Sequence, residues 1–441
     1  MKLLYGLIIL ILLQNCSFDN KTGIWKDDNN ISQKEKDIFI DFKNLSISDK
    51  SFDEKISIIN NFTFNLPQPV VNKVWHDKFY SKNNNQKNFK YNGLNEILLK
   101  SKKLSRFSID NHILFDNRNL ILTDAQGNII IFSIDANKVV KKFNFYKKKY
   151  KKLKKTLNII LEDNIIYVSD NIGYLYAYDY LNEKIIWAKY YKIPFRSNLK
   201  ITKNTIIASD QNNKLIFFDK SNGNTLKTIL TEETVVKNDF TNNLSANSNS
   251  LYFLNTYGSL YSIDLKTMDI NWILNLNPSL DVSASSLFFG SKIVFQENKI
   301  ISSSNKFTYV IDAESGILVH KKNFSTFFRP IVIKNYLFII TKNDFLIAMN
   351  LVNGKIIYSH NINEKISEFL DTKRKKVSIK NFSIINDQIY IFLNNSYIVK
   401  FSIKGTIKDI YKLPAKINSM PIFIDKLIMY IDKKNKAVLI N

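Results

Sequence analysis

Few residues of this chain have the types and spacing that catalysis or metal binding requires. The four histidines, His76, His112, His320 and His360, are far apart in the sequence and form no paired metal-ligand motif. Nucleophile-elbow, P-loop and dinucleotide-binding motifs are absent from the sequence. The carboxylates recur mainly as turn residues of a repeat. The sequence therefore predicts no catalytic residue, metal or cofactor, and it favours a scaffold or adaptor over an enzyme.

The one cysteine, Cys16, follows an apolar run from Leu3 to Leu13 and rules out an intrachain disulfide. A run this short behind a lysine is typical of an export signal rather than a spanning helix. A cysteine directly after such a run is typical of a bacterial lipoprotein, in which residues 1–15 are a signal peptide and Cys16 is lipidated. Gln14 and Asn15 depart from the small residues usual before that cysteine, so a plain signal peptide with an incidental cysteine is the alternative.

The rest of the chain divides into two parts by composition. Residues 16–60 are polar with little periodicity, which predicts a flexible, lipid-anchored tether. Residues 61–441 are short β-branched and aromatic runs separated by Asn, Asp, Lys and Gly, which predicts many short strands. The net charge of +24 comes almost wholly from lysine and indicates a solvated surface rather than a nucleic-acid site. The basic run 146–155 is interpreted as a solvated loop, with contact to anionic lipid or an acidic partner as the alternative.

A strand-ending polar residue, usually aspartate, recurs through residues 61–441. Neighbouring occurrences are 38 to 52 residues apart, the length of one four-stranded propeller blade. The positions are Asp135, Asp179, Asp219, Asp264, Asp312, Asn350 and Ser402. An eighth unit ends at Asn441 without its outer strand, and the segment 69–77, which contains Trp75, could supply it. The sequence thus predicts an all-β fold, an eight-bladed propeller of four-stranded antiparallel blades closed by an N-terminal strand.

Both residue types of the repeat have a structural explanation. The aspartate can accept hydrogen bonds from backbone amides of the turn that follows it. An aromatic residue eight positions later, such as Trp187 or Trp272, can lie between neighbouring blades and bury roughly 150–250 Å². We therefore interpret these residues as parts of the fold.

The repeat resembles the quinoprotein-type propeller motif A-x-D-x-x-(T/N)-G-x-x-x-W, seen here in Ala177, Asp179, Asn182 and Trp187. Two kinds of protein use this repeat: periplasmic dehydrogenases with pyrroloquinoline quinone, and lipoprotein propellers of the outer-membrane β-barrel assembly (BAM) machinery. The order of cysteine, tether, closing strand and eight repeats covers nearly the whole chain and is similar to the second kind. That resemblance implies a scaffold, lipid-anchored to the outer membrane on its periplasmic side, which assists insertion of β-barrel proteins.

The resemblance also implies a partner surface. In the stretch "KIPFRSNLKI", Ile193, Phe195 and Arg196 take the places that dock on the periplasmic POTRA domains of BamA. In the next inter-blade connection Asp239 matches an acidic partner-facing position, whereas Thr241 replaces the second one. Nascent outer-membrane proteins are a further expected partner, and nucleic acid is not. A purely structural turn around Arg196 is the alternative.

Two other function classes stay open. A quinone dehydrogenase needs bound calcium, a carboxylate base and usually a disulfide from adjacent cysteines, and a single cysteine cannot form that disulfide. A glycan- or peptidoglycan-binding propeller would need an exposed aromatic cluster on one face, which the sequence does not locate.

Overall fold

The computed structural model describes residues 16–18, 25–27, 52–233, 237–277, 287–373 and 375–441, and it divides into the units Met1–Lys50 and Ser51–Asn441. In the first unit, strands β1 (Cys16–Phe18) and β2 (Trp25–Asp27) pair antiparallel. The expected signal peptide, residues 1–15, lies outside the described residues, as does most of the tether. No helix among the described residues is long and apolar enough to cross a membrane.

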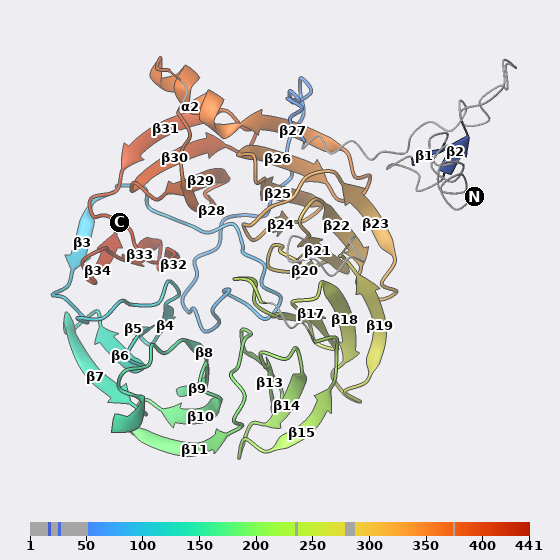
Figure 1. The fold of residues 1–441 in the computed structure, drawn as a ribbon. Coiled ribbons are helices and arrows are strands. Elements are labelled where there is room, and N and C mark those ends of the chain that lie inside the picture. Colours follow the sequence, from blue (N-terminus) through green and yellow to red (C-terminus); the bar gives the residue numbers. More distant parts are fainter. Residues whose placement is uncertain (1–15, 19–24, 28–51, 234–236, 278–286, 374) are drawn as a thin grey trace, which may run out of the picture. The chain divides into compact units, whose positions relative to one another are not determined.

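In the second unit the described residues form eight four-stranded antiparallel sheets arranged as the blades of a ring, as the sequence predicts (Figure 1). Inner strands such as β6 are nearly continuous apolar runs, because neighbouring blades bury both of their faces, whereas outer strands such as β7 alternate between half-buried and exposed residues. Blades 1 to 4 comprise β4 (Leu114–Asp116), β5 (Asn119–Thr123), β6 (Asn128–Ser133) and β7 (Lys138–Asn144); β8 (Leu157–Glu162), β9 (Ile165–Asp170), β10 (Tyr174–Asp179) and β11 (Lys184–Tyr190); β12 (Lys200–Thr202), β13 (Thr205–Ser209), β14 (Leu215–Asp219) and β15 (Thr225–Ile229); β16 (Asn243–Ala246), β17 (Ser250–Leu254), β18 (Ser259–Asp264) and β19 (Ile270–Asn275).

Blades 5 to 7 follow the same order, and blade 8 combines the two ends of the unit. They comprise β20 (Val294–Gln296), β21 (Lys299–Ser303), β22 (Thr308–Asp312) and β23 (Leu318–Lys322); β24 (Ile331–Ile333), β25 (Tyr336–Ile340), β26 (Phe345–Asn350) and β27 (Ile356–Asn361); β28 (Ile379–Ile385), β29 (Gln388–Leu393), β30 (Tyr397–Ser402) and β31 (Ile407–Lys412); β32 (Ile422–Ile424), β33 (Leu427–Ile431), β34 (Ala437–Ile440) and β3 (Ile97–Lys100). A helix, α2 (Ile362–Leu370), follows β27, and a 3-10 turn, η1 (Lys148–Tyr150), follows β7.

An N-terminal strand closes the ring, but not the predicted one. β3 pairs with β34, with Leu99 opposite Leu439, and so completes blade 8. The segment 69–77 lies among the innermost strands instead, where Trp75 is 3% exposed and exchanges backbone hydrogen bonds with Phe115 of β4. The physical reason is burial: an outer strand has one face in water, as Leu98 of β3 does with 56% exposure, whereas Trp75 belongs in the core.

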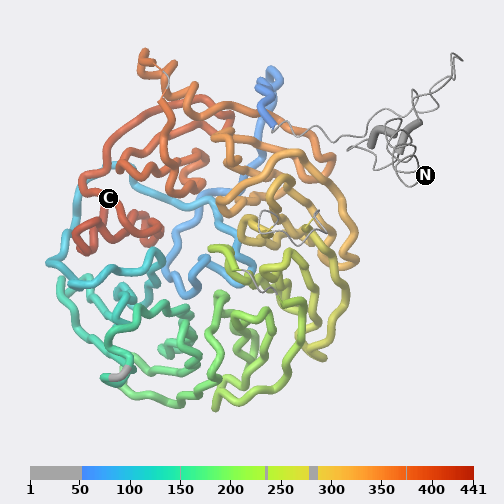
Figure 2. The backbone as a smooth tube through the Cα atoms, in the orientation of Figure 1, coloured from blue at the N-terminus to red at the C-terminus, as the bar shows by residue number. Residues whose placement is uncertain are grey.

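A central segment, residues 70–92, passes through the middle of the ring (Figure 2). It hydrogen-bonds to all eight blades among the described residues, so it links them independently of the closing strand. Its partners in blade order are Phe115, Leu161, Lys200, Ala246, Phe295, Val332, Ile384 and Lys426. The polar run 82–88 supplies many of these bonds; Asn84, with 0% exposure, donates to the carbonyls of Leu244 and Ile293.

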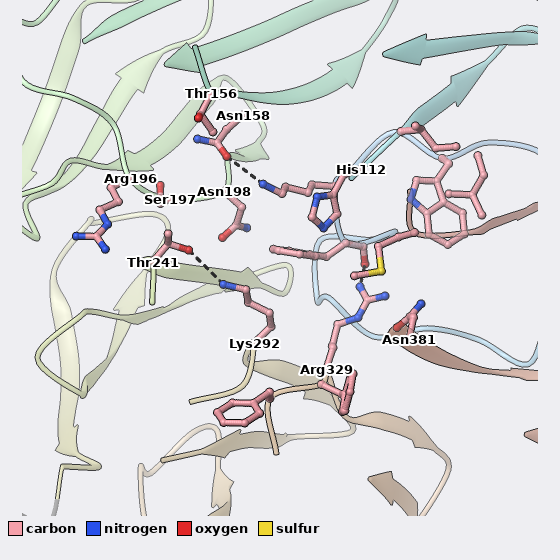
Figure 3. A pocket seen from close by; sticks show the side chains of 18 of the residues that line it. His112, Thr156, Asn158, Arg196, Ser197, Asn198, Thr241, Lys292, Arg329 and Asn381 are labelled. Carbon is pink, nitrogen blue, oxygen red and sulfur yellow. Dashed lines mark hydrogen bonds between the residues drawn. The ribbon is translucent and has the colours of Figure 1, made fainter. Parts of the chain in front are cut away.

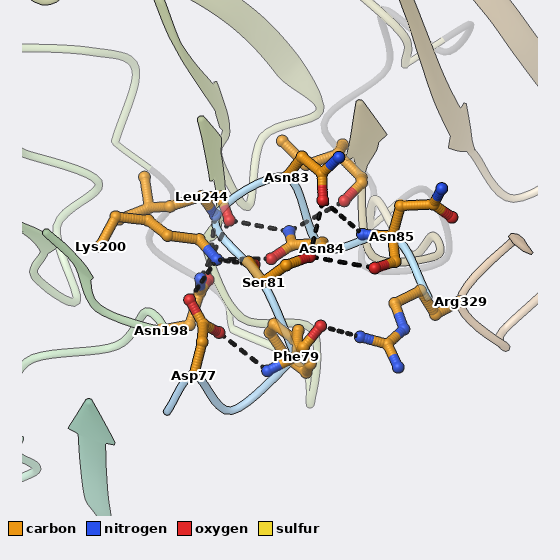
Figure 4. A network of polar contacts seen from close by, with 11 residues as sticks. Asp77, Phe79, Ser81, Asn83, Asn84, Asn85, Asn198, Lys200, Leu244 and Arg329 are labelled. Carbon is orange, nitrogen blue, oxygen red and sulfur yellow. Dashed lines mark hydrogen bonds and ion pairs between the residues drawn. The ribbon is translucent and has the colours of Figure 1, made fainter. Parts of the chain in front are cut away.

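A buried ion pair joins the central segment to blade 3 (Figure 4). Lys200 Nζ lies 2.7 Å from Asp77 Oδ2 and donates to Asn84 Oδ1 at 2.7 Å and to the Ser81 carbonyl at 3.0 Å. The Lys200 side chain is 0% exposed and that of Asp77 7%. Burial lowers the pKa of Lys200, while Asp77 opposes that shift.

The turn and wedge roles predicted for the repeat are visible in the contacts. Asp179 accepts the amides of Leu181 and Asn182, at 3.0 and 2.9 Å. Trp187 Nε1 donates to the Lys220 carbonyl of blade 3 at 3.0 Å, and its ring covers Gly223 there. Equivalent turns form at Asp219, Asp264 and Asp312, and Trp272 covers Gly316 in the same way.

The predicted anchor of blade 1, Asp135, is wrong: Ser133 holds that position, since it ends β6 opposite Asn119 as Asp179 ends β10 opposite Ile165. Ser133 Oγ accepts the amide of Ala136, whereas the Asp135 carboxylate pairs with Arg118 Nε at 2.6 Å. Gly127 lies directly before β6 as Gly173 lies directly before β10, so the turn leading into the strand has the usual length. Phe143 of β7 supplies the inter-blade contact of this blade by stacking on Tyr178 of blade 2, with 4.1 Å between ring centroids.

A second anchor, which the sequence reading missed, lies nine residues before the first in several blades. Asp170 accepts the amides of Ile172, Gly173 and Tyr174, each at 2.8 Å, and is 0% exposed. Asp210, Asn255 and Thr341 hold the same place, and Asp124 a similar one. Burial raises the pKa of Asp170. The Asp or Asn at or just after the end of the second strand in blades 1 to 4 was the available signal.

Two segments at the edges of the propeller differ from expectation. Residues 52–60, assigned to the tether, lie on blades 5 and 6: Phe52 contacts Phe324 edge-on at 5.4 Å, and Ile56 pairs with Ser359. In the basic run 146–155, Lys155 is only 4% exposed and donates to the Tyr150 carbonyl. Apolar and aromatic residues within both stretches provide the contacts.

We predict that Asp264→Asn makes the propeller less sensitive to acid. Hydrogen bonds from the amides of Thr267 and Lys266 lower the pKa of Asp264. A carboxyl whose pKa is lower in the folded state adds stability above its unfolded pKa, near 4, and loses it as the pH falls further. Asn350 makes the same type of turn bond to the amide of Val352, so the fold accepts the amide. Urea midpoints at pH 7, 4 and 3 should fall less in the variant; an equal fall would contradict the prediction.

Candidate functional site

A central chamber of about 640 Å³ lies on the axis of the ring (Figure 3). The loops that lead into the innermost strands of all eight blades contribute to its wall, and the central segment contributes Trp75, Lys78, Phe79 and Gln86. The geometry follows from the fold, because each blade begins at the axis and brings one entry loop there. Pockets of this size are typical of small-ligand sites.

Positive charge dominates the chamber. Its cationic or titratable lining residues are Lys78, His112, Arg196, Lys292, Arg329 and Lys380, and none of the described lining residues is a carboxylate. Three of the cations surround the ring of Phe79: Arg329 at 5.6 Å, Lys292 at 5.9 Å and Lys78 at 6.0 Å from its centroid. Such contacts stabilise cations only modestly, so the repulsion between them persists.

Burial and the neighbouring positive charges lower the pKa values of several basic groups in the chamber. Burial, and then the charge of Lys78, lower the pKa of Lys292 to about 7. Burial also lowers the pKa of Arg329 to about 10 and that of His112 to about 4. His112 is therefore neutral near pH 7, and its ring nitrogen lies 3.3 Å from Asp110.

The structure places the predicted docking residues in two different environments. Phe195 is 3% exposed and packs edge-on against Phe218 at 5.9 Å, so its side chain lies out of a partner's reach. Ile193 is half-buried behind the turn of Gly173, while Asp239 is exposed on the loop that leads to blade 4. Phe195 therefore holds the loop in place, and only its neighbours are accessible.

Arg196 connects the loops of blades 3 and 4. Its guanidinium donates to the carbonyls of Asn238 and, at 3.0 Å, Phe240, and it faces the chamber. Burial lowers its pKa, and the nearby charge of Asp239 opposes that shift. Arg196 therefore has the structural role that the sequence left as the alternative. Its guanidinium is half-buried, so a ligand or partner at the chamber could still contact it.

The four histidines do not assemble. His76 lies 2.7 Å from Asp116, His320 contacts the Leu351 carbonyl at 3.1 Å, and His360 stacks on Tyr358. No group of three His, Cys, Asp or Glu residues among the described residues could hold a metal ion. A metal–quinone centre needs carboxylate oxygens for its cation, and the described chamber wall offers cations instead, so these residues do not fit such a group.

Comparison with known proteins identifies a family and several solved structures with a similar fold. A family model described as outer membrane protein assembly factor BamB matches residues 108–360, more than half of the chain. No curated protein sequence matches. The crystal structure of BamB from Moraxella catarrhalis is similar with a TM-score of 0.61 and 10% identity, covering 77% of this chain and 99% of that one.

Solved structures of dehydrogenases share the fold as well. A quinohemoprotein alcohol dehydrogenase from Comamonas testosteroni has a TM-score of 0.59 at 9% identity, covering 83% of this chain and 80% of its own. A europium-containing methanol dehydrogenase has a TM-score of 0.60 at 10% identity, covering 83% and 89%. At such low identity these similarities concern the fold alone.

Proposed function

Because the chain belongs to the family of the outer membrane protein assembly factor BamB, we propose that it is a non-enzymatic scaffold of the BAM machinery. In this proposal Cys16 is lipidated and anchors the protein to the outer membrane on its periplasmic side. The propeller docks on the periplasmic POTRA domains of BamA and assists the folding and insertion of nascent β-barrel proteins. The family match over residues 108–360 is the observation that carries the proposal.

The accessible surface around Arg196 supports this docking role. Ile193 and Asp239 flank the Arg196 guanidinium on neighbouring loops, and Leu230, at the start of the loop that carries Asp239, is 70% exposed. An arginine beside exposed apolar and acidic residues is a common composition for a protein interface. We therefore assign the docking contacts to Ile193, Arg196 and Asp239, with Phe195 as the buried support.

An affinity-capture experiment from native envelopes tests the proposal. We expect wild-type protein to retain BamA, and Arg196→Glu to recover about tenfold less, the loss that one interfacial charge of about 1.4 kcal/mol would cause. Asp239→Lys should also reduce the recovery of BamA. Because this substitution breaks no hydrogen bond of the described fold, its effect would report on docking and not on folding. Lys184→Glu, on the outer strand β11, is the matched control and should capture BamA normally.

Two outcomes would count against docking at this surface. Wild-type protein that retains no BamA would end the scaffold hypothesis. Full recovery with both Arg196→Glu and Asp239→Lys would move the interface elsewhere on the propeller. Thermal unfolding of each variant shows whether the propeller is intact.

The dehydrogenase hypothesis rests on the shared fold, and the described chamber wall offers no carboxylate for the metal ion that such a centre needs. A cofactor absorbance in the purified protein, with dye-linked alcohol oxidation, would revive it. Glycan binding remains a third hypothesis, which no described feature favours.

A further inference from the structure

We propose that the central chamber binds a small organic anion that carries at least two phosphate or carboxylate groups. This inference is separate from the docking proposal, since it rests on Lys78, Lys292 and Arg329 at the axis of the ring and not on Arg196, which lines the chamber as well. Each could fail without the other.

The first argument is unpaired charge. Among the described residues, Lys292 forms no ion pair; its ammonium donates to Thr241 Oγ1 at 3.2 Å and otherwise faces aromatic rings. Lys78 has a neutral partner as well, Asn158 Oδ1 at 3.2 Å, and Arg329 donates to the Phe79 carbonyl. These cations are half-buried in the chamber wall and repel one another, so a bound anion would offset both their partial desolvation and their mutual repulsion.

The second argument is that the nearby acidic residues are engaged elsewhere. Asp77 is paired with Lys200 and offsets only part of the charge of Arg329. Asp110 lies beside the neutral His112 and offsets part of the charge of Lys78. Asp239 is exposed on its loop, next to Arg196. The cations Lys78, Lys292, Arg329 and Lys380 therefore outnumber the negative groups that could balance them in the described chamber.

The third argument is the shape and lining of the chamber. A volume of about 640 Å³ is larger than an inorganic anion needs, and part of the wall is apolar, with Trp75, Phe328 and Met420. Neutral donors alternate with the cations; Asn198 and Asn381 lie on opposite sides in Figure 3. Charged groups at several points of a partly apolar wall suit a multivalent anion with an organic body.

Calorimetric titration of the full-length protein with inorganic pyrophosphate and with citrate tests the inference at constant ionic strength. We expect stoichiometric binding of at least one of them, and a midpoint of thermal unfolding that rises with its concentration. Lys292→Met should weaken binding about tenfold or more, the usual effect of losing a charged hydrogen-bond donor. Comparison of the two titrations shows whether phosphate or carboxylate groups are preferred.

Two controls keep the result interpretable. Lys184→Met removes a rim lysine and should leave binding unchanged. Lys292→Met should remain folded without anion, because it removes repulsion from the chamber. Failure of both anions to bind the wild type, or equal binding by wild type and Lys292→Met, would overturn the inference.

Discussion

Replacing Lys200 with methionine should destabilise the propeller by about 3–5 kcal/mol, the cost of leaving one member of a buried ion pair without its partner. Asp77, whose side chain is 7% exposed, would be left without the cation that lies within ion-pair distance of it. The carbonyl of Ser81 and the amide oxygen of Asn84 would lose a donor as well. The midpoint of urea unfolding measures the loss.

Lys220→Met is the matched control for this experiment. Lys220 pairs with Glu162 at the same 2.7 Å, but the two side chains are 23% and 30% exposed. Pairs in contact with water are worth at most about 1 kcal/mol. If Lys200→Met lost no more stability than Lys220→Met, the central segment would not be an essential link between the blades.

Replacing Leu439 with alanine should cost about 2–5 kcal/mol, the usual range for truncating a buried leucine. Leu439 is 2% exposed in β34, between Leu99 of β3 and Met429 of β33. It therefore lies at the junction where the first and last parts of the ring meet. Loss of packing there weakens the closure as well as blade 8 itself.

Leu98→Ala is the control for the closure. Leu98 belongs to the same junction but is 56% exposed, so its truncation should change stability by no more than about 0.5 kcal/mol. Protease resistance and urea midpoints of both variants measure the difference. Equal effects of the two substitutions on stability would mean that β3 does not pair with β34 as the outer strand of blade 8.

The stretch with Ile193, Phe195 and Arg196 shows which features of the candidate site could be predicted from the sequence. The resemblance implied a partner-docking loop at residues 193–196, and the structure shows that Arg196 of this loop faces the central chamber. The pattern could not separate Phe195 from its neighbours, because burial depends on what blade 3 packs against it. The cationic chamber was invisible in the sequence, since its wall comes from eight loops spread between residues 112 and 422.

The repeat itself was readable from the sequence because its interactions are local. Asp179 binds amides two and three residues ahead, and each strand pairs with the next along the chain. A pattern of that kind recurs at a fixed spacing, so blade number and the structural role of Trp187 follow from it. Low sequence similarity does not weaken the inference, since turn chemistry and strand periodicity set the spacing.

The sequence by itself thus determined the ring of eight four-stranded blades and most of the anchors in the turn that follows the third strand of a blade. Only the tertiary structure decided that residues 97–100 close the ring and that the polar run 82–88 lies buried at its centre. An asparagine-rich stretch looks like a solvated loop in a sequence, yet Asn84 finds its partners 160 and 209 residues away. Contacts over such separations leave no local period, because what selects them is the shape and polarity of the finished ring.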